Sequence, residues 1–431
     1  MRQNLTLGAF AKKENSMKKG LKITALCLFL VMTVLSLASC SVAADPFASG
    51  GISYEQLMAA LEKYGNDGDN INVTVQGGTE GDLLMASHAI LSSVSVISKF
   101  SDRRDPTTGK SLGESASAGS GIIYRLNKAA GDAYIVTNYH VVFNEAFVRN
   151  GQISDDIKVY LYGQEYKDYG ISATYVGGSM NYDVAVLRVT NSEILRTSSA
   201  MAASFADSDL ITPLERAIAI GNPNGEGIAV TSGIISVTSE YIDLSLTSGS
   251  STQYRVIRTD AAINSGNSGG GLFNAKGEVI GIIHARASLS YADNVGYAIP
   301  GNLAKAVVEN ILDNCDGGEN RSVLRCLLGI MTTSHDSKAV YDTETGRVYI
   351  NEKVRVAEIV AGGKSVGKFK VGDIITAVNI AGDDYPVTRA WSVADAMLNT
   401  RVGDTVTFKV DRDGEEITLV FEITADFVVA D

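Results

Sequence analysis

The chain has 431 residues, enough for two or three domains, and its 45% hydrophobic and 20% charged residues are typical of a globular protein. Its formal net charge of -12, with no basic cluster in the body of the chain, argues against a nucleic-acid-binding protein. The 43 glycines against 6 prolines favour a β-rich chain with many tight turns.

Residues 1–40 have the pattern of an export signal. Five lysines between Lys12 and Lys22 precede an apolar run from Ile23 to Leu37. The run ends in Leu-Ala-Ser-Cys, which resembles a bacterial lipobox, in which Cys40 becomes the lipidated first residue of the mature protein. An uncleaved transmembrane anchor is the alternative, because the apolar run is close to spanning length. Either way, we expect the body of the protein outside the cytoplasm and held to a membrane.

Residues 41–82 follow as a tether with one short helical pattern, Tyr54 to Tyr64, and with no assignable chemistry. Residues 83–313 have the pattern of many short strands with regular turns, which predicts an all-β sandwich or barrel. A helix from Asn302 to Leu312 closes this region, and we expect the polar stretch Ser101 to Gly119 to be a mobile loop. The expected strands are Ala89 to Phe100, Ser120 to Arg125, Ala133 to Val142, Ile157 to Tyr162, Ile171 to Val176, Asp183 to Val189, Glu215 to Ile220, Ile228 to Val237, Tyr254 to Thr259 and Glu278 to Ile283.

A second module occupies residues 324–426 after a linker, 314–323, and is large enough for a core of its own. Cys315 and Cys326 flank the linker and could form a disulfide in an oxidising compartment, although two cysteines do not establish one. No cysteine or histidine has the spacing of metal ligands. The expected elements of the module are strands Val348 to Ile350, Ala357 to Ile359, Ile374 to Ile380, Thr405 to Val410 and Glu416 to Ile423, and a helix within Ser392 to Asn399.

One serine stands out, Ser268, within Asp260 to Gly270 between two strand patterns. A serine hydroxyl becomes a nucleophile only when a base takes its proton and the oxyanion it creates is stabilised. Gly266, Gly269 and Gly270 would let backbone amides converge beside that hydroxyl. The same residues also make ordinary turns, so the motif alone leaves a plain hairpin loop open.

A serine nucleophile needs a histidine base and a carboxylate that orients it. Of the four histidines, His140 ends a strand beside small polar residues, as a base between a cleft and a core would. We expect His88, His284 and His335 to be surface or structural histidines, since none has a carboxylate or serine turn nearby in the sequence. Asp183 opens an apolar strand and is the candidate carboxylate. The alternative for it is a strand-start residue held by turn amides.

The order His, Asp, Ser with these surroundings resembles the trypsin-like serine proteases, and specifically the HtrA (Deg) family. The resemblance covers nearly all of residues 83–312. Seven segments in order carry it: Gly119 to Ile123, Val136 to Val142, Asp183 to Leu187, Ala217 to Pro223, Thr259 to Asn264, Gly266 to Gly270 and Gly296 to Pro300.

The resemblance implies two packed six-stranded β-barrels with the active site between them. It implies His140 as general base, Asp183 as its orienting partner and Ser268 as nucleophile. The backbone N–H groups of Gly266 and Ser268 would form the oxyanion hole. No cofactor and no metal are implied.

Two positions near the nucleophile bear on activity and specificity. The family usually has proline where this chain has Ser265, which loosens the turn before the oxyanion hole and leaves open whether the hole is preformed. Ala262 lies, by similarity, at the base of the primary pocket. Because it carries no charge, we expect a small or medium apolar residue before the scissile bond.

The second module resembles a PDZ domain. Leu327, Leu328, Gly329 and Ile330 would form the loop that binds a peptide's C-terminal carboxylate while the peptide adds to a sheet edge. The run from Val371 to Asn379 matches the family's Gly-Asp-x-Ile-x-x-Val-Asn sequence, and the helix Val393 to Leu398 would line the groove. A spacer of irregular length, Asp342 to Lys353, departs from compact versions of the domain, and a generic small β domain is the alternative.

Together these resemblances imply an exported, membrane-tethered, ATP-independent serine endopeptidase on the outer face of a bacterial cytoplasmic membrane. Its partners would be unfolded or misfolded proteins, C-terminal peptides at the PDZ groove and the membrane through Cys40, with no nucleic acid. A homotrimer is the expectation carried over from the family. Two other classes stay open: a chaperone or holdase with a latent protease site, and an adaptor that binds peptides through the PDZ domain.

Overall fold

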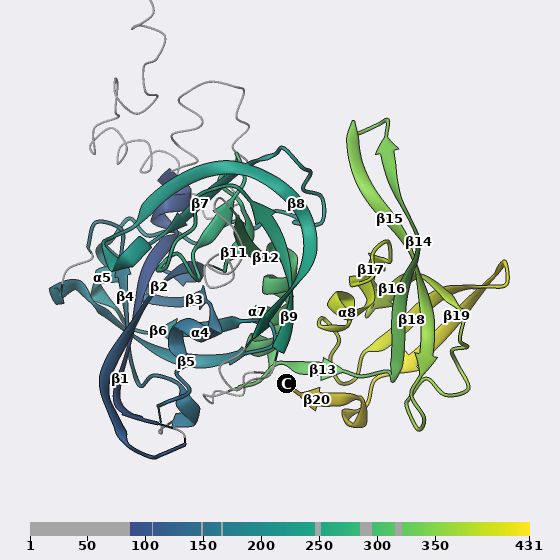
Figure 1. Ribbon diagram of the computed structural model, residues 1–431, viewed down its shortest axis with the longest axis horizontal. Coiled ribbons are helices and arrows are strands. Elements are labelled where there is room, and N and C mark those ends of the chain that lie inside the picture. Colours follow the sequence, from purple (N-terminus) through teal and green to yellow (C-terminus); the bar gives the residue numbers. More distant parts are fainter. Residues whose placement is uncertain are drawn as a thin grey trace, which may run out of the picture. The chain divides into compact units, whose positions relative to one another are not determined.

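The computed structural model describes residues 87–431 except residues 106, 148–149, 165–166, 246–250, 285–294 and 315–320 (Figure 1). The signal with Cys40, the tether with its helical pattern, and Cys315 lie outside the described residues. Within the part of the chain that is described, no helix is long and apolar enough to cross a membrane.

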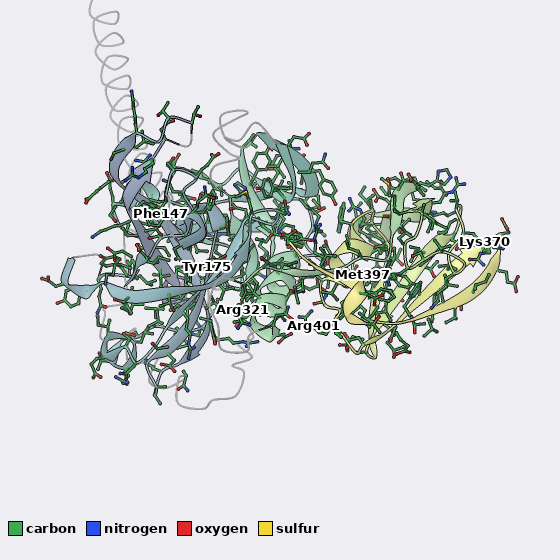
Figure 2. The ribbon with its side chains drawn as sticks, turned by 90° about the horizontal axis from the view of Figure 1, so that it is seen from below. Phe147, Tyr175, Arg321, Lys370, Met397 and Arg401 are labelled. Atoms are coloured by element: carbon green, nitrogen blue, oxygen red, sulfur yellow. The ribbon has the colours of Figure 1, made fainter. Side chains whose placement is uncertain are left out.

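The first half of the protease region is a closed six-stranded barrel in the order β1-β2-β3-β6-β5-β4. Buried residues alternate with half-buried ones along β4, because one face of the strand lines the barrel core. The ring of Phe147, labelled in Figure 2, meets the ring of Phe100 edge to face with centroids 5.4 Å apart. The strands are β1 (Ser93–Arg104), β2 (Ser111–Asn127), β3 (Asp132–Thr137), β4 (Asp156–Leu161), β5 (Ile171–Ser179) and β6 (Val184–Val189).

The second half is another closed six-stranded barrel, in the order β10-β11-β12-β9-β8-β7. The helix α7 (Gly301–Asp313) follows β12 directly and buries its apolar residues, including Val307 and Ile311, in a cluster shared with strands of both barrels. The prediction of an all-β, trypsin-like double barrel is therefore confirmed. The strands are β7 (Arg216–Gly221), β8 (Ala229–Ser245), β9 (Ser251–Thr259), β10 (Gly271–Phe273), β11 (Val279–Ile283) and β12 (Gly296–Pro300).

Two expectations about the first barrel were wrong. The stretch 101–119 is not a loop, because β1 and β2 pair from Ser93 as far as Arg104 and Ser111, so only residues 105–110 form the turn. The expected strand from Ala133 to Val142 ends at Thr137 and is followed by a short helix, α4 (Tyr139–Val142). Alternating polar residues hid the long hairpin, since its outer half is exposed on both faces. Short helical segments complete the region: η1 (Asn150–Gln152), η2 (Lys167–Tyr169), α5 (Glu193–Thr197) and η3 (Pro223–Gly225).

The C-terminal module is built on a sheet in the order β14-β15-β16-β18-β19, with β17 paired to β16. Phe369, Phe408 and Phe421 pack against one another in its core, with ring centroids 5.2 to 5.8 Å apart. A separate pair, β13 and β20, joins the two ends of the module. The elements are β13 (Leu324–Cys326), β14 (Ile330–Asp342), β15 (Arg347–Ile359), β16 (Ile374–Ile380), β17 (Asp383–Pro386), α8 (Ser392–Met397), β18 (Thr405–Arg412), β19 (Glu415–Glu422), η4 (Ala425–Phe427) and β20 (Val428–Ala430).

The spacer expected at residues 342–353 is the outer part of a long hairpin. In this hairpin β14 and β15 pair, with two register shifts, from Ile330 and Ile359 out to Asp342 and Arg347. The sequence analysis missed β14 because most of that strand is exposed and its residues are polar. Cys326 is a free, buried thiol in the module's core, and burial raises its pKa to about 11.

A buried ion pair explains the Gly-Asp sequence before β16. Arg412 donates from Nε and Nη2 to the two carboxylate oxygens of Asp373, each at 2.7 Å, and the amide of Lys370 donates to the same carboxylate at 2.8 Å. Burial alone would raise the pKa of Asp373, but these hydrogen bonds and the arginine charge outweigh it and hold the pKa below its ordinary value of 3.8.

We predict that Asp373→Asn lowers the free energy of unfolding of the C-terminal module at pH 7 by about 2–4 kcal/mol, because Arg412 loses its charged partner. Since the folded-state pKa is depressed, the stabilisation is present above about pH 4 and is lost as the pH falls through the folded-state value. Urea unfolding of the full chain is followed by fluorescence of the single tryptophan, Trp391. It measures the difference in unfolding free energy between the variant and the wild type at pH 7 and again below about pH 4.

Asp383→Asn is the matched control, since Asp383 is exposed in β17. Equal losses in the two variants would contradict the assignment, as would a difference between Asp373→Asn and wild type that persists well below pH 4.

Candidate active site

The three predicted side chains meet where the two barrels adjoin. His140 lies in α4 and Asp183 directly precedes β6, both in the first barrel, while Ser268 lies between β9 and β10 of the second. The His140 Nδ1 atom is 2.7 Å from Asp183 Oδ2, and its Nε2 atom is 2.9 Å from Ser268 Oγ. The arrangement is therefore a continuous chain of contacts from carboxylate to imidazole to hydroxyl.

The Asp183 carboxylate is held by a strained and buried backbone. Its φ of +50° lies in the left-handed region, and its main-chain carbonyl accepts a hydrogen bond of 2.8 Å from the side chain of Asn138. The other carboxylate oxygen, Oδ1, accepts the backbone N–H of His140 at 2.9 Å. The carboxylate thus contacts both the backbone N–H and the ring of His140. Asp183 is therefore not a strand-start residue held only by turn amides.

Burial and charge act in opposite directions on this carboxylate. Burial would raise the pKa of Asp183, but the imidazoles of His140 and His284 and the hydrogen bonds from His140 lower it below its ordinary value. Asp183 therefore remains ionised in the interior, which an orienting partner of a histidine base requires.

The nucleophile loop depends on glycine at two positions. Gly266 and Gly269 have φ values of +95° and +86°. A Cβ atom on Gly269 would also lie 2.3 Å from the Ser120 carbonyl oxygen and 2.3 Å from Thr137 Oγ1. Only glycine fits there, so the residue after Ser268 fixes how closely the loop approaches the first barrel.

The amides of this loop divide into two groups. Those of Asn267, Gly269 and Gly270 donate to carbonyls within the protein at 3.0 to 3.1 Å. For the amides of Gly266 and Ser268, no protein partner is found among the described residues. These are the two N–H groups predicted to form the oxyanion hole, and they are the ones available to a ligand there.

Ser120, on β2, is a residue whose role the sequence analysis missed. Its buried Oγ donates to the Gly266 carbonyl at 2.7 Å and accepts the Asn222 amide at 2.7 Å, while its own amide donates to the Ser268 carbonyl at 2.8 Å. It therefore braces the nucleophile loop from the opposite barrel, which stabilises the turn that Ser265 leaves without a proline. The Gly-Ser-Gly sequence was noted only as part of a family resemblance.

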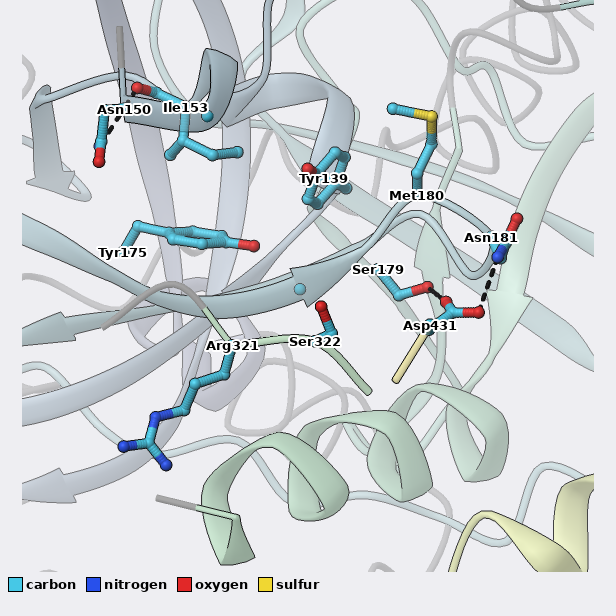
Figure 3. Close-up of a pocket in the computed structure, with 12 residues that line it drawn as sticks. Tyr139, Asn150, Ile153, Tyr175, Ser179, Met180, Asn181, Arg321, Ser322 and Asp431 are labelled. Carbon is cyan, nitrogen blue, oxygen red and sulfur yellow. Dashed lines mark hydrogen bonds between the residues drawn. The ribbon is translucent and has the colours of Figure 1, made fainter. Parts of the chain in front are cut away.

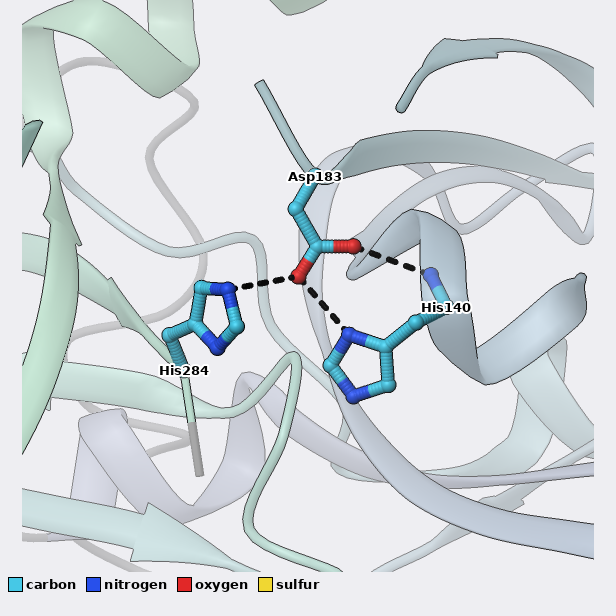
Figure 4. A group of neighbouring side chains, drawn as sticks. All are labelled: His140, Asp183 and His284. Atoms are coloured by element: carbon cyan, nitrogen blue, oxygen red, sulfur yellow. Dashed lines mark hydrogen bonds and ion pairs between the residues drawn. The ribbon is translucent and has the colours of Figure 1, made fainter. Parts of the chain in front are cut away.

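His284 is buried, as a structural histidine would be, but it has a carboxylate beside it that the sequence did not indicate. This histidine directly follows β11 and is 1% exposed, and its Nε2 atom lies 3.3 Å from Asp183 Oδ2 (Figure 4). No carboxylate is near it in the sequence, but the fold brings the strand after the nucleophile back to Asp183. His88 is half-buried and His335 is exposed, as expected.

His140, Asp183 and His284 are also the one group of potential metal ligands found among the described residues, with ligand atoms within 4.8 Å of one another. The Oδ2 atom of Asp183 is already in contact with His140 Nδ1 at 2.7 Å. A metal ion here would have to displace the proton between those atoms, so we assign no metal to the group.

A pocket of about 450 Å³ lies beside α4 (Figure 3). Tyr139 and Tyr175 line one part of it, and the side chain of Asp431 accepts hydrogen bonds from Ser179 and, at 2.7 Å, from Asn181 in another part. The pocket does not include Ala262, which is exposed and whose carbonyl accepts a 2.8 Å hydrogen bond from Thr231. The role of Ala262 at the base of a primary pocket stays a prediction.

The predicted carboxylate loop precedes the edge strand β14, whose outer side carries no other strand in the described part of the sheet. The Leu327 amide is already used, because it donates to the Phe427 carbonyl at 2.8 Å. For the amides of Leu328 and Gly329 the described residues offer no partner. Gly329 has a φ of +76°, and Ile330 begins β14.

Comparison with known proteins gives two family matches: the trypsin-like peptidase domain over residues 119–282 and the PDZ domain over residues 326–423. The serine protease Do-like HtrA of Lactococcus lactis subsp. cremoris is 33% identical over 313 residues, which cover 70% of this chain and 70% of that protein. The periplasmic serine endoprotease DegP of Escherichia coli K12 is 31% identical over 308 residues, or 71% of this chain and 56% of DegP.

Among solved structures, the HtrA-type protease AlgW with a tripeptide superposes with a TM-score of 0.50 at 25% identity, covering 81% of this chain and 98% of that one. The double barrel, the C-terminal module and these relatives agree. The chain therefore belongs to the HtrA (Deg) family of serine proteases, with a trypsin-like peptidase domain followed by a PDZ domain.

Proposed function

We propose that the protein is an exported, membrane-tethered serine endopeptidase that degrades unfolded or misfolded proteins, with Ser268 as nucleophile, His140 as general base and Asp183 as its orienting partner. The observation that carries the proposal is the unbroken chain of contacts from Asp183 Oδ2 through the imidazole of His140 to Ser268 Oγ, at 2.7 and 2.9 Å. These are the distances at which a serine proton passes to an imidazole.

The reaction follows from those contacts. Ser268 Oγ attacks the carbonyl carbon of the scissile peptide bond while its proton moves to His140 Nε2. The imidazolium is stabilised by the buried Asp183 carboxylate and then donates the proton to the leaving amine, which breaks the C–N bond. Water, deprotonated by the same imidazole, hydrolyses the acyl-enzyme and restores Ser268.

The negative charge on the substrate oxygen would be met by the amides of Gly266 and Ser268, which lack a protein partner among the described residues. Removing one such donor costs roughly 3 kcal/mol of transition-state stabilisation. The bracing of this loop by Ser120 supports a hole that is preformed despite Ser265.

The PDZ domain would select substrates or signals by their C-termini. The free edge of β14 suits a peptide that adds as a further strand, and the amides of Leu328 and Gly329 suit its terminal carboxylate. Exposed apolar side chains of Leu327 and Met331, at 46% and 56%, stand at the start of that edge.

The location in this proposal is supported by the sequence. The lipobox-like ending at Cys40 supports a lipid anchor on the outer face of a bacterial cytoplasmic membrane. A homotrimer is part of the proposal as an expectation from the family.

We predict that Ser268→Ala abolishes hydrolysis of unfolded casein by the mature protein, because no hydroxyl remains to attack, and that a C-terminal peptide raises the wild-type rate. Release of casein fragments measures both. Ser337→Ala, an exposed serine on β14, serves as the control and keeps full activity. Casein left intact by the wild-type protein, with and without peptide, would refute the enzyme and favour a holdase or adaptor.

We predict that Ser120→Ala lowers kcat by roughly 10-fold to 100-fold, because the Gly266 carbonyl loses the donor that holds the oxyanion turn. It also lowers the free energy of unfolding by about 1–3 kcal/mol, since a buried carbonyl and amide lose their partner. Initial-rate kinetics and urea unfolding measure the two effects. A kcat equal to that of Ser117→Ala, on the same strand, would show that the brace is dispensable.

We predict that Cys40→Ala moves the protein from the membrane to the soluble fraction when it is expressed in a bacterial host, because lipidation needs the thiol. Fractionation and labelling with a fatty acid measure it. A variant that stays in the membrane fraction would favour the uncleaved anchor over the lipoprotein.

A further inference from the structure

His284 is fixed in the interior beside the triad. It follows β11, and its backbone N–H donates to the Tyr297 carbonyl of β12 at 2.8 Å. The ring of Tyr254, from β9, meets its imidazole edge to face with centroids 5.2 Å apart. The side chain is 2% exposed, so the position of the imidazole is set by the second barrel.

The imidazole of His284 faces the same carboxylate oxygen that orients the general base. Its Nε2 atom is 3.3 Å from Asp183 Oδ2, and His140 Nδ1 is 2.7 Å from that oxygen. The two rings stand 5.6 Å apart and flank the carboxylate (Figure 4). One buried oxygen atom is thus shared by two histidines from different barrels.

We propose that His284 is a positioning residue of the protease: its Nε2–H supports Asp183 Oδ2 and keeps the carboxylate aimed at His140. The inference rests on the proposed function, since it concerns the same triad. His284 acts through Asp183, and it does not touch the substrate or Ser268.

The physical reason is the burial of Asp183. An ionised carboxylate in the protein interior is stable only when its oxygens have partners. Oδ1 has the His140 amide, whereas Oδ2 has the two imidazoles. Without His284, Oδ2 would keep His140 alone, and the carboxylate could rotate away from the geometry that the proton transfer needs.

The charge of His284 also matters. Among the described residues, three titratable side chains lie against its imidazole: Asp183 from the start of β6, His140 from α4 and Tyr254 from β9. A neutral His284 leaves the charge of Asp183 to the His140 cation that forms during catalysis. A protonated His284 would share that charge and repel the His140 cation.

The test compares His284→Leu with His284→Gln in the full chain. Leucine removes the donor, whereas glutamine places a neutral N–H near the position of Nε2 and cannot become a cation. We expect kcat to fall by about 10-fold to 100-fold in the leucine variant with KM within about twofold, and to recover to within about fivefold in the glutamine variant. Lys276→Leu, at an exposed residue in the turn before β11, is the control and keeps the wild-type kcat.

The pH dependence gives a readout that a merely structural residue would not move. In the leucine variant the Asp183 carboxylate is free to rotate away from His140, so the His140 cation loses part of its stabilisation and the acid limb of the kcat profile should shift to lower pH. Histidine NMR titration of the same proteins, simplified by a total of four histidines, follows the His140 ring without requiring proteolysis.

The two readouts separate this inference from the proposed function. If the wild-type protein has no protease activity but the His140 titration differs between it and His284→Leu, the proposed function is refuted. The contact of His284 with Asp183 is then still supported. An active protein in which leucine leaves kcat, the acid limb and the His140 titration unchanged would overturn the inference. Equal losses of kcat in both variants, with an equal fall in thermal stability, would overturn it as well.

Discussion

The buried carboxylate of Asp183 is the constraint on which the site depends. It sits in a left-handed backbone conformation and is 3% exposed, and the imidazoles of His140 and His284 with the hydrogen bonds from His140 hold its pKa below the ordinary value. The backbone N–H and the ring of His140 both contact this carboxylate, so the helix α4 cannot shift without breaking the contact that orients the ring. In the proposed mechanism this ring is the general base, and we infer that His284 ties the carboxylate to the other barrel.

The two barrels are joined at the site by few but buried polar contacts. Ser120 on the first barrel holds the loop of Ser268 on the second, and His284 on the second reaches Asp183 on the first. If the Ser120 contact breaks, the buried Gly266 carbonyl loses its donor, which is expensive in the interior. This crosswise arrangement helps to hold Ser268 Oγ and His140 Nε2, which come from separate barrels, 2.9 Å apart.

Much of the fold could be predicted from the sequence, since alternating apolar residues fix strands such as β16, whose bounds match the expectation. The triad residues could be proposed from their order and surroundings, because the chemistry restricts the residue types. The contacts of Ser120 and His284 could not, since they join segments more than 100 residues apart and no local pattern marks them. The strand β14 was also not predicted, because most of its side chains are exposed to solvent and do not show the apolar alternation of a strand that faces a core.

Reaction of the purified chain with a fluorophosphonate tests most directly whether Ser268 is an activated nucleophile. The modified residue is identified by mass spectrometry. Such reagents need a serine activated by its base and an oxyanion site, but they do not need a substrate protein or an occupied PDZ groove. We expect a single adduct on Ser268 that forms in the folded protein and not in urea. No adduct, or adducts spread over other serines at similar rates, would contradict it.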